Sequence, residues 1–174
     1  MELFANGVKI REQRIAGQHG FERSVKSPIE KAKITWNIPR PPHDVNLVAI
    51  AWGPPVTGPF WAIPKPYQPS SRTWHPRVIG TTNPIWVDAD GDGSFTSARG
   101  YAKRLVQKHG TDPAKLLSEL ATYDEAVSAQ AASLCQAAGQ DLRSADFVHL
   151  LTKASPAVQR GFVAFVSTLP TQHE

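Results

Sequence analysis

Proline and tryptophan are confined almost entirely to one part of this 174-residue chain. Twelve of the 15 prolines lie between Pro28 and Pro84, and all five tryptophans lie between Trp36 and Trp86. After residue 100 the sequence is rich in alanine and leucine. Proline cannot donate to a strand ladder or continue a helix, whereas alanine is the best helix former. We therefore predict an α+β protein, with a β-sandwich-like module over 1–96 and a helical extension over 97–174, packed together as one unit.

Asn6-Gly7 between two apolar runs predicts a β-hairpin over residues 2–15, because a type I′ turn needs positive φ at both central positions. The hairpin begins at residue 2, so no lead-in strand precedes it in this sequence. An uncovered strand edge recruits other chains. We therefore expect either a partner domain against this surface or self-association through the 2–15 hairpin.

Five or six short strands are expected in all. Alternation of apolar and polar residues over 32–38 predicts a strand with one buried face. The nearly continuous apolar run 45–52 is typical of a central strand buried on both faces. Shorter strands are expected at 78–79 and 85–87.

Three or four helices are expected after residue 97. One should run from Ala98 to His109, and a second from Pro113, capped by Asp112, to Ala138. Ser144 should cap a short third helix, and Ser155-Pro156 should begin the last one.

The most specific motif is the aspartate-rich segment that starts at Asp88. Carboxylates at positions 1, 3 and 5 followed by glycine at position 6 match the opening of a twelve-residue calcium loop, here 88–99. Phe95 should anchor this loop in the core. The expected ligands of a structural Ca²⁺ are Asp88, Asp90, Asp92, the carbonyl of Ser94, and Thr96.

The motif departs from the full pattern at position 12, where Arg99 replaces the bidentate glutamate. The site would need a carboxylate from elsewhere, and Asp44, Asp124 and Glu125 are candidates that the sequence does not rank. The alternative is an ion-free Asx-turn loop whose carboxylates cap the helix that follows. Three carboxylates within five residues repel one another unless a cation lies between them, which favours calcium.

Catalytic constellations are missing from the sequence. No two of the six histidines lie within five residues of each other, so there is no local two-histidine metal motif. His43 is interpreted as a loop hydrogen-bonding residue, and Cys135 as a small buried hydrophobe. Neither a nucleophile elbow nor a phosphate-binding glycine loop is present. We expect no enzymatic activity from this chain alone.

Charge and hydropathy exclude two classes of partner. The net charge of +4 is scattered, without a lysine or arginine cluster, so nucleic acid is not expected. The longest apolar run is six residues, and no basic-then-apolar leader follows Met1, so neither a membrane span nor a signal peptide is expected.

Several segments resemble the C-terminal region of carbaryl-hydrolase-like metallohydrolases, bacterial members of the polymerase-and-histidinol-phosphatase superfamily. They are the hairpin 2–12, the run 39–51, Arg77–Gly80, and Asn-Pro-Ile-Trp-Val-Asp-Ala-Asp-Gly-Asp-Gly at 83–93. In that family an N-terminal barrel carries the catalytic metal ligands, and nothing here matches that barrel. The resemblance implies a non-catalytic accessory module whose partner is a catalytic domain.

A second hypothesis comes from the aromatic residues of the long loop 60–74. Exposed aromatic rings there would suit a carbohydrate-binding module, whereas buried ones would serve as scaffold.

Overall fold

The computed structural model describes residues 1–15, 32–55 and 77–170, and confirms the α+β class. The strands are β1 (Glu2–Ala5), β2 (Val8–Glu12), β3 (Val45–Pro55), β4 (Arg77–Thr81) and β5 (Ile85–Val87). The helices are α1 (Ala98–His109), α2 (Pro113–Leu120), α3 (Glu125–Ala137), α4 (Ala145–Thr152) and α5 (Pro156–Val166).

All five strands belong to one antiparallel sheet in the order β2-β1-β3-β4, with β5 also paired to β3. The 11-residue β3 is long enough to pair with β5 near its start and with β4 near its end. Within the described ranges, the second sheet of the expected sandwich is not found.

The predicted hairpin is confirmed. Asn6 has φ 47° and Gly7 has φ 83°, which are the positive values that a type I′ turn requires. The hairpin joins the sheet through β1, which pairs with both β2 and β3.

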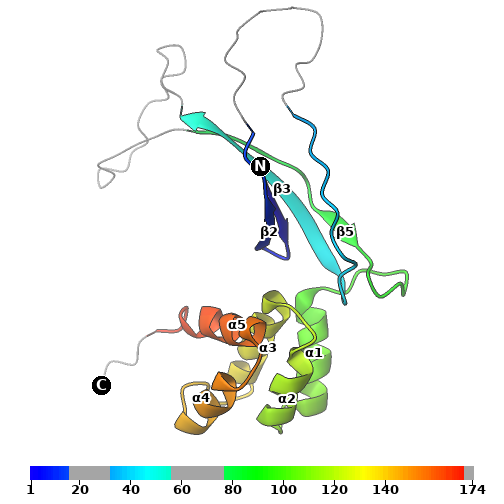
Figure 1. Cartoon of the computed structure of the whole chain (residues 1–174). Coiled ribbons are helices and arrows are strands. Elements are labelled where there is room, and N and C mark those ends of the chain that lie inside the picture. The colour runs from blue at the N-terminus through cyan, green and yellow to red at the C-terminus, as the bar shows by residue number, and fades with distance from the viewer. Residues whose placement is uncertain (16–31, 56–76, 171–174) are drawn as a thin grey trace, which may run out of the picture.

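The strand expected over 32–38 does not form, although its alternating pattern is visible in the burial. Ile34, Trp36 and Ile38 are half-buried and the residues between them are exposed, yet no strand is assigned there. Figure 1 shows the segment as an extended trace. The alternating burial shows that one side of this extended segment is covered. Such covering does not require the hydrogen bonds of a strand ladder.

The long helix expected over 113–138 is divided in two, which gives five helices in the part of the chain that the structure describes. The chain leaves α2 at Ala121, and the Asp124 carboxylate accepts the Val127 amide at 2.9 Å to begin α3. An aspartate N-cap satisfies an otherwise unpaired amide at the start of a helix, so it starts a new helix where the apolar spacing suggested continuity.

The main hydrophobic core lies within the helices, and it includes Leu116, Leu120, Val127, Val158 and Phe162. α3 and α5 approach closely at Gly161, where an added Cβ would lie 2.6 Å from the Glu125 carbonyl oxygen. By contrast, β3 is central in the sheet but not buried on both faces as predicted. Val45, the first residue of β3, is buried, whereas residues 46–51 are half-buried and Trp52 is 50% exposed.

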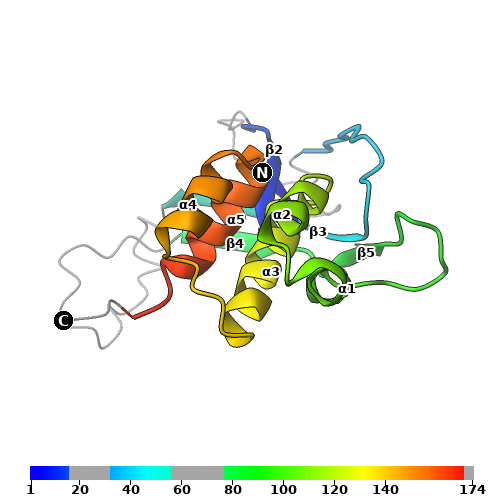
Figure 2. The same ribbon diagram turned by 90° about the horizontal axis from the view of Figure 1, so that it is seen from below.

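The sheet and the helices meet end to end (Figures 1 and 2). No described strand packs extensively against a helix. The contacts that join the two parts come from the turn at Asn6, from residues 40–44 before β3, and from the aspartate loop between β5 and α1.

Candidate functional site

The aspartate loop has the backbone geometry that its sequence predicts. Gly91 and Gly93 have φ values of 80° and 83°, which only glycine adopts without strain. The Asp88 carboxylate accepts the amides of these two glycines at 2.6 and 2.9 Å. The side chain at position 1 therefore closes the turn.

The next two carboxylates each accept the amide two residues ahead. Asp90 accepts the amide of Asp92 at 3.2 Å, and Asp92 accepts both the amide and the hydroxyl of Ser94 at 2.8 Å. These are successive Asx turns, which hold the alternate carboxylates in a compact loop.

Asp44 organises this loop from a distant segment. It is fully buried and lies just before β3. Its Oδ1 accepts the amides of Ala89 at 2.7 Å and Asp90 at 3.4 Å, and its Oδ2 accepts the amide of Thr96 at 2.7 Å. Burial by itself would raise the pKa of Asp44, but these amides hold it below the ordinary value. Asp44 is therefore an ionised carboxylate in a buried position.

The structure distinguishes among the three candidates for the missing carboxylate. Carboxylate oxygens of Asp44, Asp88 and Asp90 all lie within 4.8 Å of one another. Asp124 instead caps α3, and Glu125 pairs with Arg160 at 2.8 Å. Asp44 is thus the residue placed to complete the acidic cluster, and we call Asp44, Asp88 and Asp90 the aspartate cluster.

The aspartate cluster has no cationic partner among the described residues. The nearby guanidinium of Arg40 donates through Nε at 2.8 Å, and through Nη2, to the carbonyl of Ala89 rather than to a carboxylate. The Tyr101 hydroxyl donates to Asp90 Oδ2 at 2.8 Å and accepts the Asp44 amide at 3.4 Å. Burial, followed by the bond to Asp90, raises the pKa of Tyr101 to about 12, so the hydroxyl remains a donor.

The other predicted ligands are not members of the aspartate cluster. Asp92 is not part of the aspartate cluster, and the Thr96 hydroxyl accepts from Arg104 Nη2 at 3.3 Å. Arg99, at position 12, points to α3, where it donates to Gln130 at 3.1 Å. Phe95 does not enter the core: it is half-buried and packs on Trp86, with ring centroids 4.5 Å apart.

One part of the ion-free alternative is wrong. The loop carboxylates do not cap α1, because the Ser97 hydroxyl accepts the Gly100 amide at 3.1 Å and is itself the cap. The carboxylates are engaged by the amides of their own loop.

His43 lies in a second polar group at the junction. It is buried, and its ring lies 5.7 Å from that of Tyr101 and 5.3 Å from that of Tyr123. Its Nε2 is 3.2 Å from Asp124 Oδ2, but off the direction of a good hydrogen bond, and Nδ1 has no partner among the described residues. Asn6 also donates to Asp124, at 2.8 Å. His43 therefore packs the junction rather than serving as the loop hydrogen-bonding residue we expected.

Sequence reasoning missed Arg40 and Tyr101. Arg40 lies in a proline-rich run, and Tyr101 reads as an ordinary apolar helix position, so only their long-range contacts reveal them. Cys135, in contrast, is buried as predicted, and burial raises its pKa to about 11.

One face of the sheet forms a second candidate site. Cross-strand pairing places Phe4 opposite Val48, and Trp52 opposite Ile79, and Ile50 lies between Val48 and Trp52 on the same face. Trp52 and Ile79 are 50% and 55% exposed, and the other three are half-buried. We call these five residues the apolar sheet face.

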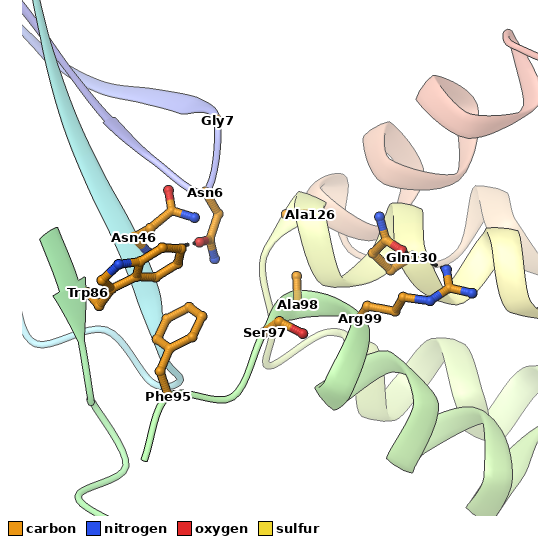
Figure 3. A pocket seen from close by; sticks show the side chains of 10 residues that line it. All are labelled: Asn6, Gly7, Asn46, Trp86, Phe95, Ser97, Ala98, Arg99, Ala126 and Gln130. Atoms are coloured by element: carbon orange, nitrogen blue, oxygen red, sulfur yellow. Dashed lines mark hydrogen bonds between the residues drawn. The ribbon is translucent and has the colours of Figure 1, made fainter. Parts of the chain in front are cut away.

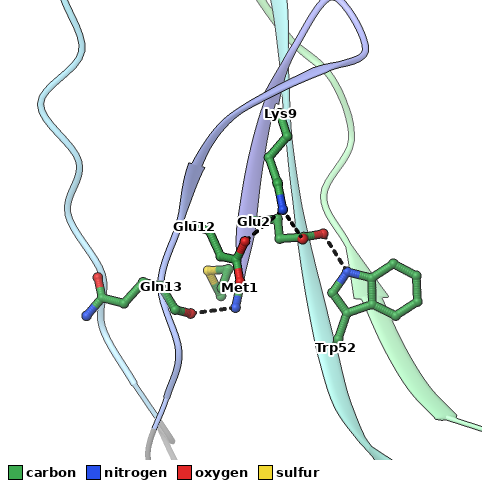
Figure 4. Close-up of polar contacts among 6 residues, drawn as sticks. All are labelled: Met1, Glu2, Lys9, Glu12, Gln13 and Trp52. Carbon is green, nitrogen blue, oxygen red and sulfur yellow. Dashed lines mark hydrogen bonds and ion pairs between the residues drawn. The ribbon is translucent and has the colours of Figure 1, made fainter.

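A charged group lies beside Ile50 and Trp52 of the apolar sheet face, and Figure 4 shows its contacts with Trp52. The Glu2 carboxylate accepts from Trp52 Nε1 at 2.8 Å and from Lys9 Nζ at 3.0 Å, and Lys9 also pairs with Glu12 at 2.7 Å. The hydrogen bonds from Lys9 and Trp52 lower the pKa of Glu2. An apolar patch with a polar rim is typical of a protein interaction surface.

Searches against protein family models, curated protein sequences and solved structures find no match for this chain. Among the helices that the structure describes, none has the length and apolar character needed to cross a bilayer. The aromatic loop 60–74, on which the carbohydrate hypothesis depends, lies outside the described residues.

Proposed function

We propose that this chain is a non-catalytic accessory module that docks onto the catalytic domain of a bacterial metallohydrolase. The observation that carries the proposal is the apolar sheet face, on which Trp52 and Ile79 remain half-exposed. Leaving large apolar side chains in water forgoes roughly 1.5–3 kcal/mol each. A partner that covers this face would recover about half of that free energy for each of these two half-exposed side chains.

The nature of the partner rests on the resemblance of residues 2–12, 39–51, 77–80 and 83–93 to the C-terminal region of the carbaryl-hydrolase-like enzymes. In the sheet these four segments are neighbours, since they contain all or part of each strand from β1 to β5. A sheet whose apolar face is partly exposed suits a role in supporting an adjacent catalytic barrel.

We also propose a structural Ca²⁺ in the 88–99 loop. Asp44, Asp88 and Asp90 would hold it, together with the Asp92, Ser94 and Thr96 groups that the motif suggests. Hard carboxylate oxygens are the ligands that calcium prefers, and the cluster lacks a cationic partner within the described residues. Bound calcium would offset two of the three negative charges of the cluster and fasten the sheet to α1.

Docking can be tested with the catalytic barrel of a carbaryl-hydrolase-like enzyme from which its own C-terminal region has been removed. Sedimentation velocity and calorimetry should show a 1:1 complex with a dissociation constant on the order of 1 μM. Ile79→Lys should weaken it at least tenfold, because it places a charge in the covered face. The matched control is Val163→Lys, at a 60%-exposed valine on α5, which should bind like the wild type.

Two outcomes would contradict the proposal. One is the absence of any complex with the barrel. The other is a dimer of this chain that Ile79→Lys or Phe4→Lys dissociates, which would assign the face and the 2–15 hairpin to self-association.

A further inference from the structure

An open cleft of about 620 Å³ lies where the sheet meets the helices (Figure 3). It is lined from one side by the hairpin turn, β3 and β5, and from the other by the starts of α1 and α3. It is separate from the aspartate cluster, although the same 88–99 loop contributes to both.

Aromatic side chains form the wall on the sheet side. Trp86 of β5 is 59% exposed and packs against Phe95 at an interplanar angle of 64°. This edge contact with Phe95 orients the indole while most of it remains accessible. An exposed and oriented indole provides a flat surface on which the C–H groups of a ring can stack.

Polar side chains from both walls border the same cleft. Arg99 uses Nη1 to contact Gln130, which leaves its other guanidinium N–H groups and the Gln130 amide N–H₂ without partners among the described residues. The side-chain amide of Asn46, which is paired across the sheet with Trp86, also makes no hydrogen bond in the described part of the chain. A guanidinium matches a carboxylate in bidentate geometry, and two amides match hydroxyl groups.

We propose that this cleft binds an acidic oligosaccharide, with one sugar ring stacked on Trp86 on the sheet side and the carboxylate of another ring held by Arg99 on the helix side. Asn46 and Gln130 donate to and accept from the ring hydroxyls. An apolar ligand that covered these three polar groups would remove their water without replacing its hydrogen bonds, which disfavours it. Arg99 stands at position 12 of the loop, where the calcium motif has a glutamate. In this proposal its side chain binds the ligand of the cleft and takes no part in binding the ion.

The proposal does not depend on docking to a catalytic domain. It is tested on the whole chain with oligomers of galacturonate, glucuronate and mannuronate, each compared with its carboxyl-reduced counterpart. At least one oligouronate should bind and shift the indole N–H resonance of Trp86, identified by its loss in Trp86→Phe. Its reduced counterpart should bind about tenfold more weakly, since one charge-assisted contact is missing.

Variants assign the contacts. Trp86→Ala should weaken binding about tenfold or more, as expected for an aromatic anchor. Ile85→Ala is the control, because Ile85 is similarly exposed on the same strand but lies outside the cleft, and it should bind as the wild type does. Arg99→Gln should remove the preference for uronate over reduced sugar while retaining part of the affinity.

The inference is overturned if no oligouronate binds at millimolar concentration, or if Trp86→Ala and Ile85→Ala bind equally well with both variants folded by circular dichroism. It is also overturned if peptides with a free C-terminal carboxylate bind this cleft more tightly than any saccharide.

Discussion

The carboxylate of Asp44 accepts the amide N–H of Thr96 at 2.7 Å across 52 residues of sequence. The other oxygen of Asp44 accepts the amide of Ala89, so one buried side chain holds both the entrance and the exit of the aspartate loop. Because Asp44 directly precedes β3 and Thr96 directly precedes the N-cap of α1, this contact joins the sheet to the helices.

Asp44→Asn should destabilise the fold by about 3 kcal/mol. The amide group would present N–H to a buried amide donor, so at least one charge-assisted hydrogen bond is lost and one N–H is left unsatisfied. Urea unfolding in the presence of a chelator measures this contribution without any bound metal. Asp146→Asn, at an exposed position in α4, is the control and should change stability by less than about 0.5 kcal/mol.

Calcium should raise the melting temperature of the wild type by about 5 °C relative to chelator, because an ion bound only by the native state stabilises it by mass action. Asp90→Ala should abolish this shift, and Asp146→Ala should keep it. Identical melting curves in chelator and in millimolar calcium would refute the site. An Asp90→Ala variant that is more stable than the wild type would also refute the site, because it would show that the carboxylates repel one another with no cation between them.

Stability should fall in acid. Asp44 and Asp124 both have pKa values below the ordinary 3.8. At Asp44 the backbone amides outweigh the effect of burial, and at Asp124 the adjacent His43, the Val127 amide and Asn6 do so. Their contribution is therefore fully present above the unfolded-state pKa and is lost as the pH falls below it towards the folded-state values. The free energy of unfolding should decline between about pH 5 and pH 2, and less steeply in Asp44→Asn. A flat profile over this range would contradict the prediction.

Gly161→Ala should destabilise the helical core by about 2–3 kcal/mol, since the new Cβ would lie 2.6 Å from both the Glu125 carbonyl oxygen and the Ser128 Cβ. Gly80→Ala is the matched control, because an added Cβ in β4 meets nothing within 4 Å. Its stability should stay within about 0.5 kcal/mol of the wild type. Equal stability of the two variants by urea unfolding would show that α3 and α5 can separate without cost.

The sequence by itself determined the features whose partners lie a few residues away. Asn6-Gly7 and Gly93 adopt the positive φ values that their turns require, and Asp112 caps α2 by accepting the Lys115 amide at 3.1 Å. Such features are set by backbone sterics and by hydrogen bonds between near neighbours, so the residue types alone predict them. The same holds for the division into a strand-rich and a helical part.

Only the tertiary structure decided which distant groups meet. Asp44, Asp124 and Glu125 were equivalent on sequence, and the placement of β3 beside β5 brings Asp44 alone to the loop. Likewise, an alternating or continuous apolar pattern shows that side chains are suited to burial, but not what covers them. Within the described residues, 32–38 therefore form no strand and Trp52 is half-exposed, because pairing and burial depend on the path of the whole chain.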